Sequence, residues 1–513
     1  MSQIQLDMFE VQLGAGMLLQ FRDEEASTVT VLADAGVHAA RYAQNHVHKK
    51  LNNTLPDPKR IDLMIGTHYD KDHLYGLIPI IQDTSIDIGE AWLPPVANDT
   101  QSHAYEDSAN DTHMLANQFA KDDNRASLNA YLRAKADFCE RMKQLQMATM
   151  NQERYELSEV PEQLSEEYFR AHVKEANILL DAESYDHTDD LSESPTLPKS
   201  DFQLPSIGSD YWRVRGELRY LYEDFEYRHW LSHQDKDLAH RHACSFAFLR
   251  RSAAKDAINA TYLEQVVRAL VKRKIPIQCY KIQDGVPGRF YWDATQRRFI
   301  PGQVQTSGPV LTLLGPSQGL VQKHWKRLPV GGYFATSMLS LIALKPITAS
   351  NQLSYVIRFE YANQGVLVSG DAGFVDFTIG RSRKYHPNLL NTLLPLHVVQ
   401  VAHHGGNNAH FYRALLKAGY GKSETKPFLL LSHAVDDAKR PSTEFGQFIQ
   451  QIRHNDTDIK LLFTSRPNRN KVQNFLPLIH PVVGYPVSAN VGDVQMKYTP
   501  VHGWQVLKHA IAP

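Results

Sequence analysis

The chain has 513 residues, of which 42% are hydrophobic, so it is too long for one ordinary domain and apolar enough to build a full core. Its 55 basic residues nearly balance its 56 acidic residues, which excludes a general electrostatic attraction to nucleic acid or to a membrane surface. Three widely spaced cysteines argue against a disulfide framework or a thiolate zinc site and favour a cytoplasmic location. No segment is apolar enough to predict a membrane partner or a signal peptide.

Residues 1–96 alternate strand-like and helix-like segments. Apolar, β-branched runs at residues 29–32 and 61–65 predict strands, and residues 39–51 predict a helix between them. This alternation is typical of an α/β domain, so we assign residues 1–96 to its first half.

The composition changes over residues 97–276, which we interpret as a mostly helical insertion. Helix-forming residues dominate positions 114–150. Residues 151–201 then carry fourteen acidic side chains against four basic ones, which predicts a flexible acidic stretch, with a plain solvated spacer as the alternative. Such an insertion offers a surface for a protein partner.

Residues 277–513 return to strand-like sequence and form the second half of the α/β domain with a C-terminal extension. Strands are predicted at residues 277–281, 310–314, 353–359, 365–369, 397–401, 428–431 and 459–463. Helical segments near Leu389 and at residues 411–417 and 443–454 separate several of these strands. Two α/β halves divided by an insertion is the simplest organisation.

Four side chains that can bind metals follow the predicted strand at residues 61–65. They are His68, Asp70, Asp72 and His73, in the spacing H-x-D-x-D-H. A loop at the end of a buried strand can curl these side chains around one point, and imidazole with carboxylate suits divalent ions. A polar helix cap with Asp72 as the capping residue is the alternative interpretation.

Two later strand ends carry side chains of the same kind. The strand at residues 365–369 ends in Gly370-Asp371, and the strand at 397–401 leads to His403-His404. Either motif alone is weak evidence, because Gly-Asp is common in turns and adjacent histidines are often incidental. Three such motifs at strand ends indicate one shared site.

The order of these motifs resembles the metallo-β-lactamase superfamily, and most closely the hydrolase domain of the ComEC-like DNA-uptake competence proteins. Further similarity lies in V-Q-L-G-A-G at residues 11–16, in L-A-D-A-G at residues 32–36 and in N-Q-L-S-Y-V at residues 351–356. The resemblance covers about residues 5–95 and 305–465 and implies a four-layer αββα sandwich with two divalent metal ions, zinc or manganese.

The resemblance also implies roles for single residues. His68 and Asp70 would bind one ion, Asp72 and His73 the second, and Asp371 would bridge them. His404, with His403 as the alternative, would complete a shell. Supporting positions around these ligands are Asp34, Asn351, Ser354 and His433.

This chain departs from the branch at several positions. Asp70 stands where many family members have histidine, and the extra carboxylate favours Mn²⁺ more than an all-histidine pocket would. A middle histidine ligand of many relatives has no clear counterpart. The candidates by position alone are His103, His113, His229, His233 and His324. The late histidine of the branch is also missing, since the chain has Arg440-Pro441-Ser442 there. His433 could replace it, with a capping role at the end of strand 428–432 as the alternative.

The favoured function is a metal-dependent phosphodiesterase or nuclease acting on DNA, in which two divalent ions activate a water for in-line attack. Asp72 or Asp371 would accept the water proton. One alternative is a hydrolase of a small molecule, such as a cyclic nucleotide, a phosphorylated metabolite, a lactone or a thioester. Another is an effector whose hydrolase is gated by a partner bound to the insertion. The substrate-binding residues are not predicted.

Overall fold

The computed structural model describes most of the predicted α/β halves. The described residues are 2–23, 27–39, 41–95, single positions between 128 and 143, 257–302, 308–325, 349–372, 374–379, 384–406, 408–422, 427–434, 437, 440–453, 460–465 and 492–508. The chain divides into two compact units, of which the first comprises Met1–Leu128, Asn259–Trp325 and Ile347–Pro513. The second, Asn129–Ile258 with Lys326–Pro346, lies almost entirely outside the described residues.

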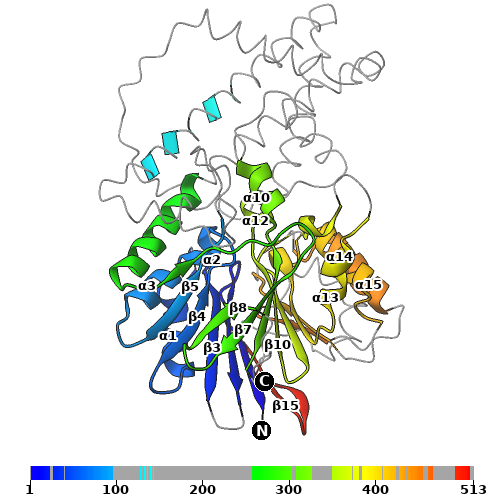
Figure 1. The fold of residues 1–513 in the computed structure, drawn as a ribbon, viewed down its shortest axis with the longest axis horizontal. Coiled ribbons are helices and arrows are strands. Elements are labelled where there is room, and N and C mark those ends of the chain that lie inside the picture. The colour runs from blue at the N-terminus through cyan, green and yellow to red at the C-terminus, as the bar shows by residue number, and fades with distance from the viewer. Residues whose placement is uncertain are drawn as a thin grey trace, which may run out of the picture. The chain divides into compact units, whose positions relative to one another are not determined.

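The first unit is α/β and contains two mixed eight-stranded sheets (Figure 1). The first sheet has the order β16-β15-β1-β2-β3-β4-β5-β6. Its strands are β1 Gln3–Met8, β2 Gly16–Arg22, β3 Thr28–Ala35, β4 Arg60–Ile65, β5 Asp87–Trp92, β6 Ile277–Gln278, β15 Val494–Thr499 and β16 Gly503–Lys508. Strands β3 to β6 run parallel, whereas the others pair antiparallel.

The second sheet has the order β14-β13-β12-β11-β10-β9-β7-β8. Its strands are β7 Gly288–Asp293, β8 Arg298–Pro301, β9 Val310–Gly315, β10 Val356–Tyr361, β11 Gln364–Val368, β12 Val398–Gln400, β13 Phe428–Leu431 and β14 Lys460–Phe463. Strands β11 to β14 are parallel, and β7 to β10 are antiparallel. The predicted strands are therefore present, but β2, β5 and the hairpins β7–β8 and β15–β16 were not predicted.

The core lies between the two sheets. Val31, Leu63 and Ile65 of the first sheet share one buried cluster with Ile357 and Val366 of the second. Successive strand residues point to opposite faces, so alternate positions of β3 and β4 enter this cluster. The remaining apolar positions face the helices, which is why these strands have nearly continuous hydrophobic sequences.

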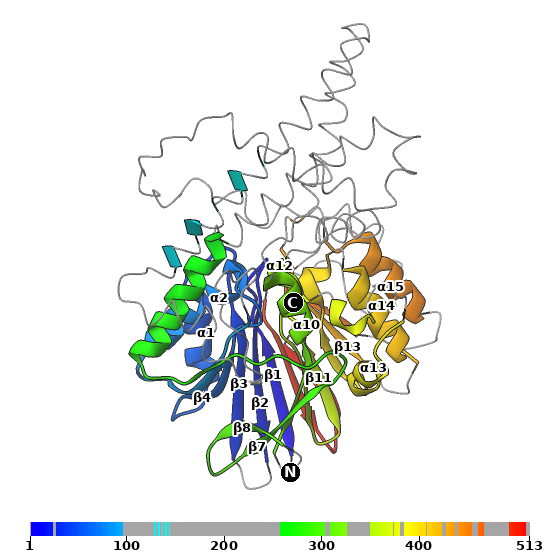
Figure 2. The same ribbon diagram turned by 45° about the horizontal axis from the view of Figure 1, so that its top comes forward.

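Helices cover the outer faces of the sheets (Figures 1 and 2). On the first sheet lie α1 His46–Thr54, α2 Lys71–Leu74, α3 Leu77–Gln82 and a helix at residues 257–272. On the second lie α13 Pro387–Leu393, α14 Ala409–Ala418 and α15 Thr443–Arg453, while α10 Gln318–Trp325 and α12 Ala349–Gln352 precede β10. Within the part of the chain that the structure describes, every helix is too short or too polar to cross a bilayer.

Helix α1 begins at His46 and not at residue 39 as predicted. The preceding residues are held in turns, because the His38 amide donates to the Val11 carbonyl and the Gln44 side chain donates to the Tyr75 carbonyl. These hydrogen bonds tie the segment before α1 to residues 11 and 75 of the same unit.

The carboxyl ends of the parallel strands in both sheets lead to the predicted site residues. Strand β4 precedes His68, β11 precedes Asp371, β12 precedes His404 and β13 precedes His433. In α/β sheets, ligands bind outside these strand ends. From Asn259 onward, helix 257–272, which we assigned to the insertion, belongs to the first unit and contacts the loop after β4 through Asp70.

Candidate metal centre

The loop after β4 carries four of the predicted ligands on a short, buried segment. Helix α2 begins directly after Asp70, so Asp72 and His73 lie in its first turn. Asp72 is therefore inside the helix and does not cap it, which removes the alternative interpretation of this motif. Gly36 allows the close approach of β3, because a Cβ at this position would lie 1.5 Å from the Asp72 carbonyl oxygen.

Gly370 and the His403-His404 pair shape the loops of the second sheet. Gly370 has φ +50°, and a Cβ there would lie 2.4 Å from Thr67 Oγ1. His403 and His404 both have φ 52°, in the left-handed region that non-glycine residues rarely adopt. Consecutive left-handed residues cost about 1–3 kcal/mol each, a strain that is concentrated at functional sites.

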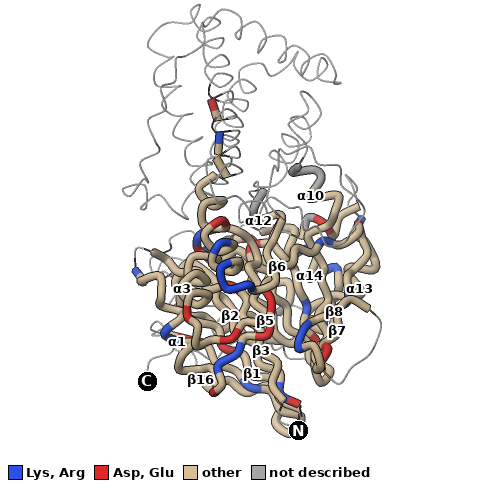
Figure 3. The backbone as a smooth tube through the Cα atoms, turned by 60° about the vertical axis from the view of Figure 1, so that its left-hand side comes forward, with Lys and Arg blue, Asp and Glu red and all other residues tan. Residues whose placement is uncertain are grey.

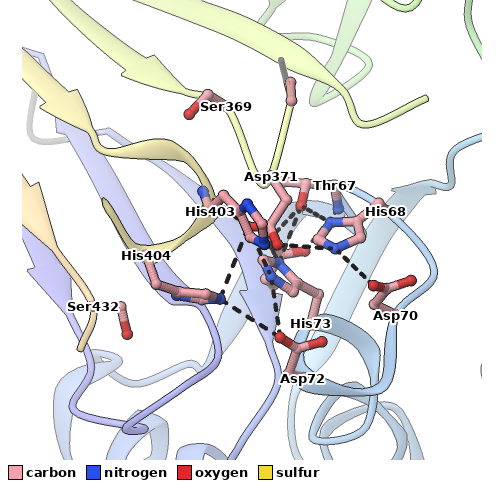
Figure 4. Close-up of polar contacts among 12 residues, drawn as sticks. Thr67, His68, Asp70, Asp72, His73, Ser369, Asp371, His403, His404 and Ser432 are labelled. Atoms are coloured by element: carbon pink, nitrogen blue, oxygen red, sulfur yellow. Dashed lines mark hydrogen bonds and ion pairs between the residues drawn. The ribbon is translucent and has the colours of Figure 1, made fainter. Parts of the chain in front are cut away.

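These loops bring six side chains together (Figure 4). His68 Nε2 lies 3.7 Å from Asp70 Oδ2 and 3.8 Å from Asp371 Oδ2. His73 Nε2 lies 3.5 Å from Asp371 Oδ1, and His404 Nε2 lies 3.5 Å from Asp72 Oδ2. All six side chains are buried. The three separate motifs therefore converge on one site.

The six side chains form two groups that can each hold a metal ion. The first group is His68, Asp70 and Asp72. The second group is Asp72, His73, Asp371 and His404. Within each group the ligand atoms lie within 4.8 Å of one another. Asp72 belongs to both groups, while Asp371 directs Oδ2 to His68 and Oδ1 to His73.

Asp34 and Thr67 orient the two histidines of the first loop. Asp34 accepts hydrogen bonds from the Thr67 amide at 2.7 Å and from the Thr67 hydroxyl at 2.6 Å. Asp34 Oδ2 lies 2.8 Å from His73 Nδ1, so this ring nitrogen carries a proton. Because the Thr67 hydroxyl donates to Asp34, it accepts from His68 Nδ1 at 3.2 Å. In the neutral rings, both Nε2 lone pairs then face the cluster.

Burial and neighbouring charge act in opposite directions on these groups. Burial lowers the pKa of His68, and the nearby His73 lowers it further. Burial also opposes the charged form of His73, but Asp34, Asp371 and Asp72 outweigh it and hold its pKa well above 6.5. For Asp371, burial is outweighed by His404 and His73, which hold its pKa well below 3.8. The cluster thus favours an ionised Asp371 at neutral pH.

Several polar atoms that face the centre of the cluster lack hydrogen bonds. Among the described residues, His68 Nε2, His73 Nε2, His404 Nε2 and Asp371 Oδ2 have no hydrogen-bond partner. Buried polar atoms are normally paired, because leaving one unpaired costs about 1–3 kcal/mol. These atoms are also the nitrogen and oxygen donors that bind divalent ions, so the residues present fit a metal centre.

His403 lies next to His404 but has a different environment. Its backbone amide donates to Asp371 Oδ1 at 3.1 Å. Its Nε2 lies 3.2 Å from one guanidinium nitrogen of Arg440, and the other terminal nitrogen of Arg440 donates to Asp437 Oδ2 at 3.3 Å. His403 is in neither group, so the geometry selects His404 from this pair.

The other predicted supporting residues lie outside the two groups. His433 is fully buried, is in neither group, and has no hydrogen-bond partner for its ring nitrogens among the described residues. Burial lowers its pKa to about 4. Asn351 and Ser354 are buried, and the Asn351 carbonyl accepts from the Ser354 amide at 3.2 Å.

The histidines considered for a middle ligand are not part of this geometry. His103, His113, His229 and His233 lie outside the described residues, as does the side chain of His324 in α10. Two residues of the site, Thr67 and Asn259, were not predicted. Thr67 is next to His68 in the motif and could have been found, whereas Asn259, which donates to Asp70, has no local signal.

No protein-family model matches the chain, and a search of the curated proteins found no match. The site is therefore assigned from its own residues and geometry.

Proposed function

We propose that the chain has the metallo-β-lactamase fold and is a hydrolase that uses two divalent metal ions to cleave phosphodiester bonds in DNA. The observation that carries this proposal is the pair of buried ligand groups sharing Asp72, with three histidines and three aspartates directed at one another. Two helix-covered mixed sheets with the site at strand ends support the fold.

The donor atoms favour a particular class of ion. Each group combines imidazole nitrogen with carboxylate oxygen and contains no thiolate. Imidazole suits zinc and manganese, while added carboxylates shift the preference towards harder ions such as Mn²⁺. We therefore propose Mn²⁺ or Zn²⁺ in both groups. Bound ions would lower the pKa of a water and polarise a phosphoryl oxygen.

The protein's own residues would orient the ligands and accept a proton. Asp34 and Thr67 hold Nδ1 of His73 and of His68, so that Nε2 of each ring faces the cluster. Asp371 is the first candidate to accept a proton from water, because its Oδ2 faces the cluster and has no hydrogen bond among the described residues. Asp72 is the second candidate for this role, since it is shared by both groups.

The case for a phosphodiester substrate depends on the site and on positive charge beside it. The buried guanidinium of Arg440 contacts His403, next to the second group, and its charge is partly balanced by Asp437; it would help to orient an anionic substrate. The proposal does not depend on a continuous basic surface. On the side shown in Figure 3, basic and acidic residues are interspersed over the described backbone.

A metal and cleavage assay tests the proposal. Metal content is measured for wild type, Asp72→Ala and His404→Ala, together with Mn²⁺- and Zn²⁺-dependent cleavage of labelled DNA. We expect about two ions per wild-type chain. Asp72→Ala should reduce binding at both groups, and His404→Ala mainly at the second. The matched control is His502→Ala, because this histidine is exposed on a turn.

Each outcome bears on a different part of the proposal. A wild-type protein that binds no metal overturns it completely. Metal binding without cleavage of DNA, but with cleavage of a small phosphodiester such as bis(p-nitrophenyl) phosphate, would replace DNA by a small substrate. Metal-dependent cleavage that is lost in both site variants and kept in His502→Ala supports it.

A further inference from the structure

Asn259 connects a distant helix to the candidate metal centre. Its side-chain nitrogen donates a hydrogen bond to Asp70 Oδ1 at 2.6 Å, although the two residues are 189 positions apart. Asn259 is 2% exposed and Asp70 is 1% exposed, so water does not compete for this bond. A buried, short hydrogen bond to a carboxylate is among the stronger ones in proteins.

The helix that carries Asn259 is fixed on the first sheet's side of the molecule (Figure 2). Leu263, Val266, Val267 and Leu270 lie on one face at helical spacing and are fully buried. After the end of the helix, the Arg273 guanidinium donates to the backbone carbonyls of Ile81, Asp83 and Ile86. Apolar packing and these hydrogen bonds together hold Asn259 at a defined position.

A second contact joins the helix to the metal-site loop. Tyr262, one turn after Asn259, packs edge-to-face on Tyr75 with ring centroids 5.6 Å apart. Lys71, between Asp70 and Asp72 in sequence, places its ammonium 5.1 Å from the Tyr75 ring and 5.4 Å from the Tyr262 ring. These cation–π contacts attach the start of α2 to the helix.

The hydrogen bond from Asn259 determines how Asp70 presents its oxygens. With Oδ1 held by Asn259, rotation of the carboxylate is restricted and Oδ2 faces His68 Nε2 at 3.7 Å. His68 and Asp70 are the two ligands that belong to the first group alone, and His68 is already oriented by Thr67. Residues that orient ligands in this way typically change metal affinity by about 10–100-fold.

We infer that Asn259 is a positioning residue for the first ligand group and selectively raises the metal affinity of that group. This inference depends on the proposed function only in requiring that the two groups bind metal. It makes helix 257–272 part of the metal centre, whereas the second group, through Asp371 and His404, does not depend on this contact.

The test compares full-length wild type with Asn259→Leu, Asn259→Ala and the control Lys272→Ala. Leucine keeps the branched shape of asparagine but has no donor, and alanine removes the donor without adding bulk, so an effect shared by both variants reports on the hydrogen bond. Lys272 is exposed on the same helix. Mn²⁺ is titrated by calorimetry, and electron paramagnetic resonance distinguishes a spin-coupled pair from a single ion. Circular dichroism confirms the fold of each variant.

We expect Asn259→Leu and Asn259→Ala to weaken one of two Mn²⁺ affinities by about 10–100-fold and to remove the spin-coupled signal. The other affinity and both affinities of Lys272→Ala should be unchanged. Equal affinities in wild type and Asn259→Leu would overturn the inference and leave the proposed function intact. Equal weakening of both sites would also overturn it, because it indicates a structural effect. If wild type binds no Mn²⁺ or Zn²⁺, the proposed function fails and the inference fails with it.

Discussion

The two ligand groups differ in how much of the fold each one needs. The first group takes all its ligands from residues 68–72, within one loop after β4. The second adds Asp371 and His404, which follow strands of the other sheet. The first group can therefore be recognised in the sequence, whereas the second exists only when the two sheets pack together. A local motif therefore provides the first ligand group, and the packing of the two sheets provides the second.

Asp371 belongs to the second group and also faces His68 of the first, so its substitution should have the largest effect. Asp371→Asn keeps the size of the side chain but removes a charge that faces His68 and His73. We expect metal-dependent hydrolysis to fall by about a thousandfold or more, which corresponds to about 4 kcal/mol. Steady-state rates with saturating metal measure this loss.

Asp284→Asn is the control for this change, because Asp284 belongs to neither group and accepts a hydrogen bond from the Gly319 amide, which asparagine can also accept. A loss of only one bound ion in Asp371→Asn would show that Asp371 does not connect the two groups.

A smaller effect on metal binding is expected from substitution of Asp34, which orients the histidines of the loop but is in neither ligand group. In Asp34→Asn, an amide nitrogen facing His73 Nδ1 would donate to it and move the ring proton to Nε2, which then cannot bind metal. We expect Zn²⁺ affinity of the second group to fall by about 10–100-fold. Competitive titration against a zinc-sensitive dye measures it, and an unchanged affinity would show that Asp34 does not determine the tautomer.

His433 tests whether a buried histidine outside both groups affects stability instead of metal binding. Burial lowers its pKa to about 4, below the usual 6.5, so between these values only the unfolded chain binds the proton. Proton uptake by the unfolded chain therefore leaves the free energy of unfolding unchanged above about pH 6.5. It lowers that free energy by about 3 kcal/mol as the pH falls towards 4.

Urea unfolding of metal-free wild type and His433→Gln at about pH 7.5 and about pH 4.5 measures this difference. The wild type should lose more stability than the variant over this interval. Equal losses would mean that His433 is already charged in the folded protein.

The smallest effect is expected at His403, the neighbour of a ligand. Its ring faces Arg440, and its contact with Asp371 uses the backbone amide, which alanine retains. His403→Ala should keep both ions and change the hydrolysis rate by less than about threefold, or about 0.6 kcal/mol. Metal analysis beside His404→Ala gives a direct comparison of adjacent positions. Loss of an ion in His403→Ala would reverse the assignment within the pair.

The sequence by itself determined the features that depend on near neighbours along the chain. Strand β4, the ligand spacing from His68 to His73 and the α/β alternation could all be predicted, because periodicity and strand-end loops are local properties. Strand ends also marked Asp371 and the histidine pair as candidates.

Only the tertiary structure decided the features that join distant segments. Strand β15 pairs with β1 from the other end of the chain, and Asn259 reaches Asp70 across 189 residues. The choice of His404 over His403 depends on two left-handed residues and on Arg440. No local pattern encodes such contacts, because they form only where the packing of two sheets and a helix brings buried polar groups within hydrogen-bond distance.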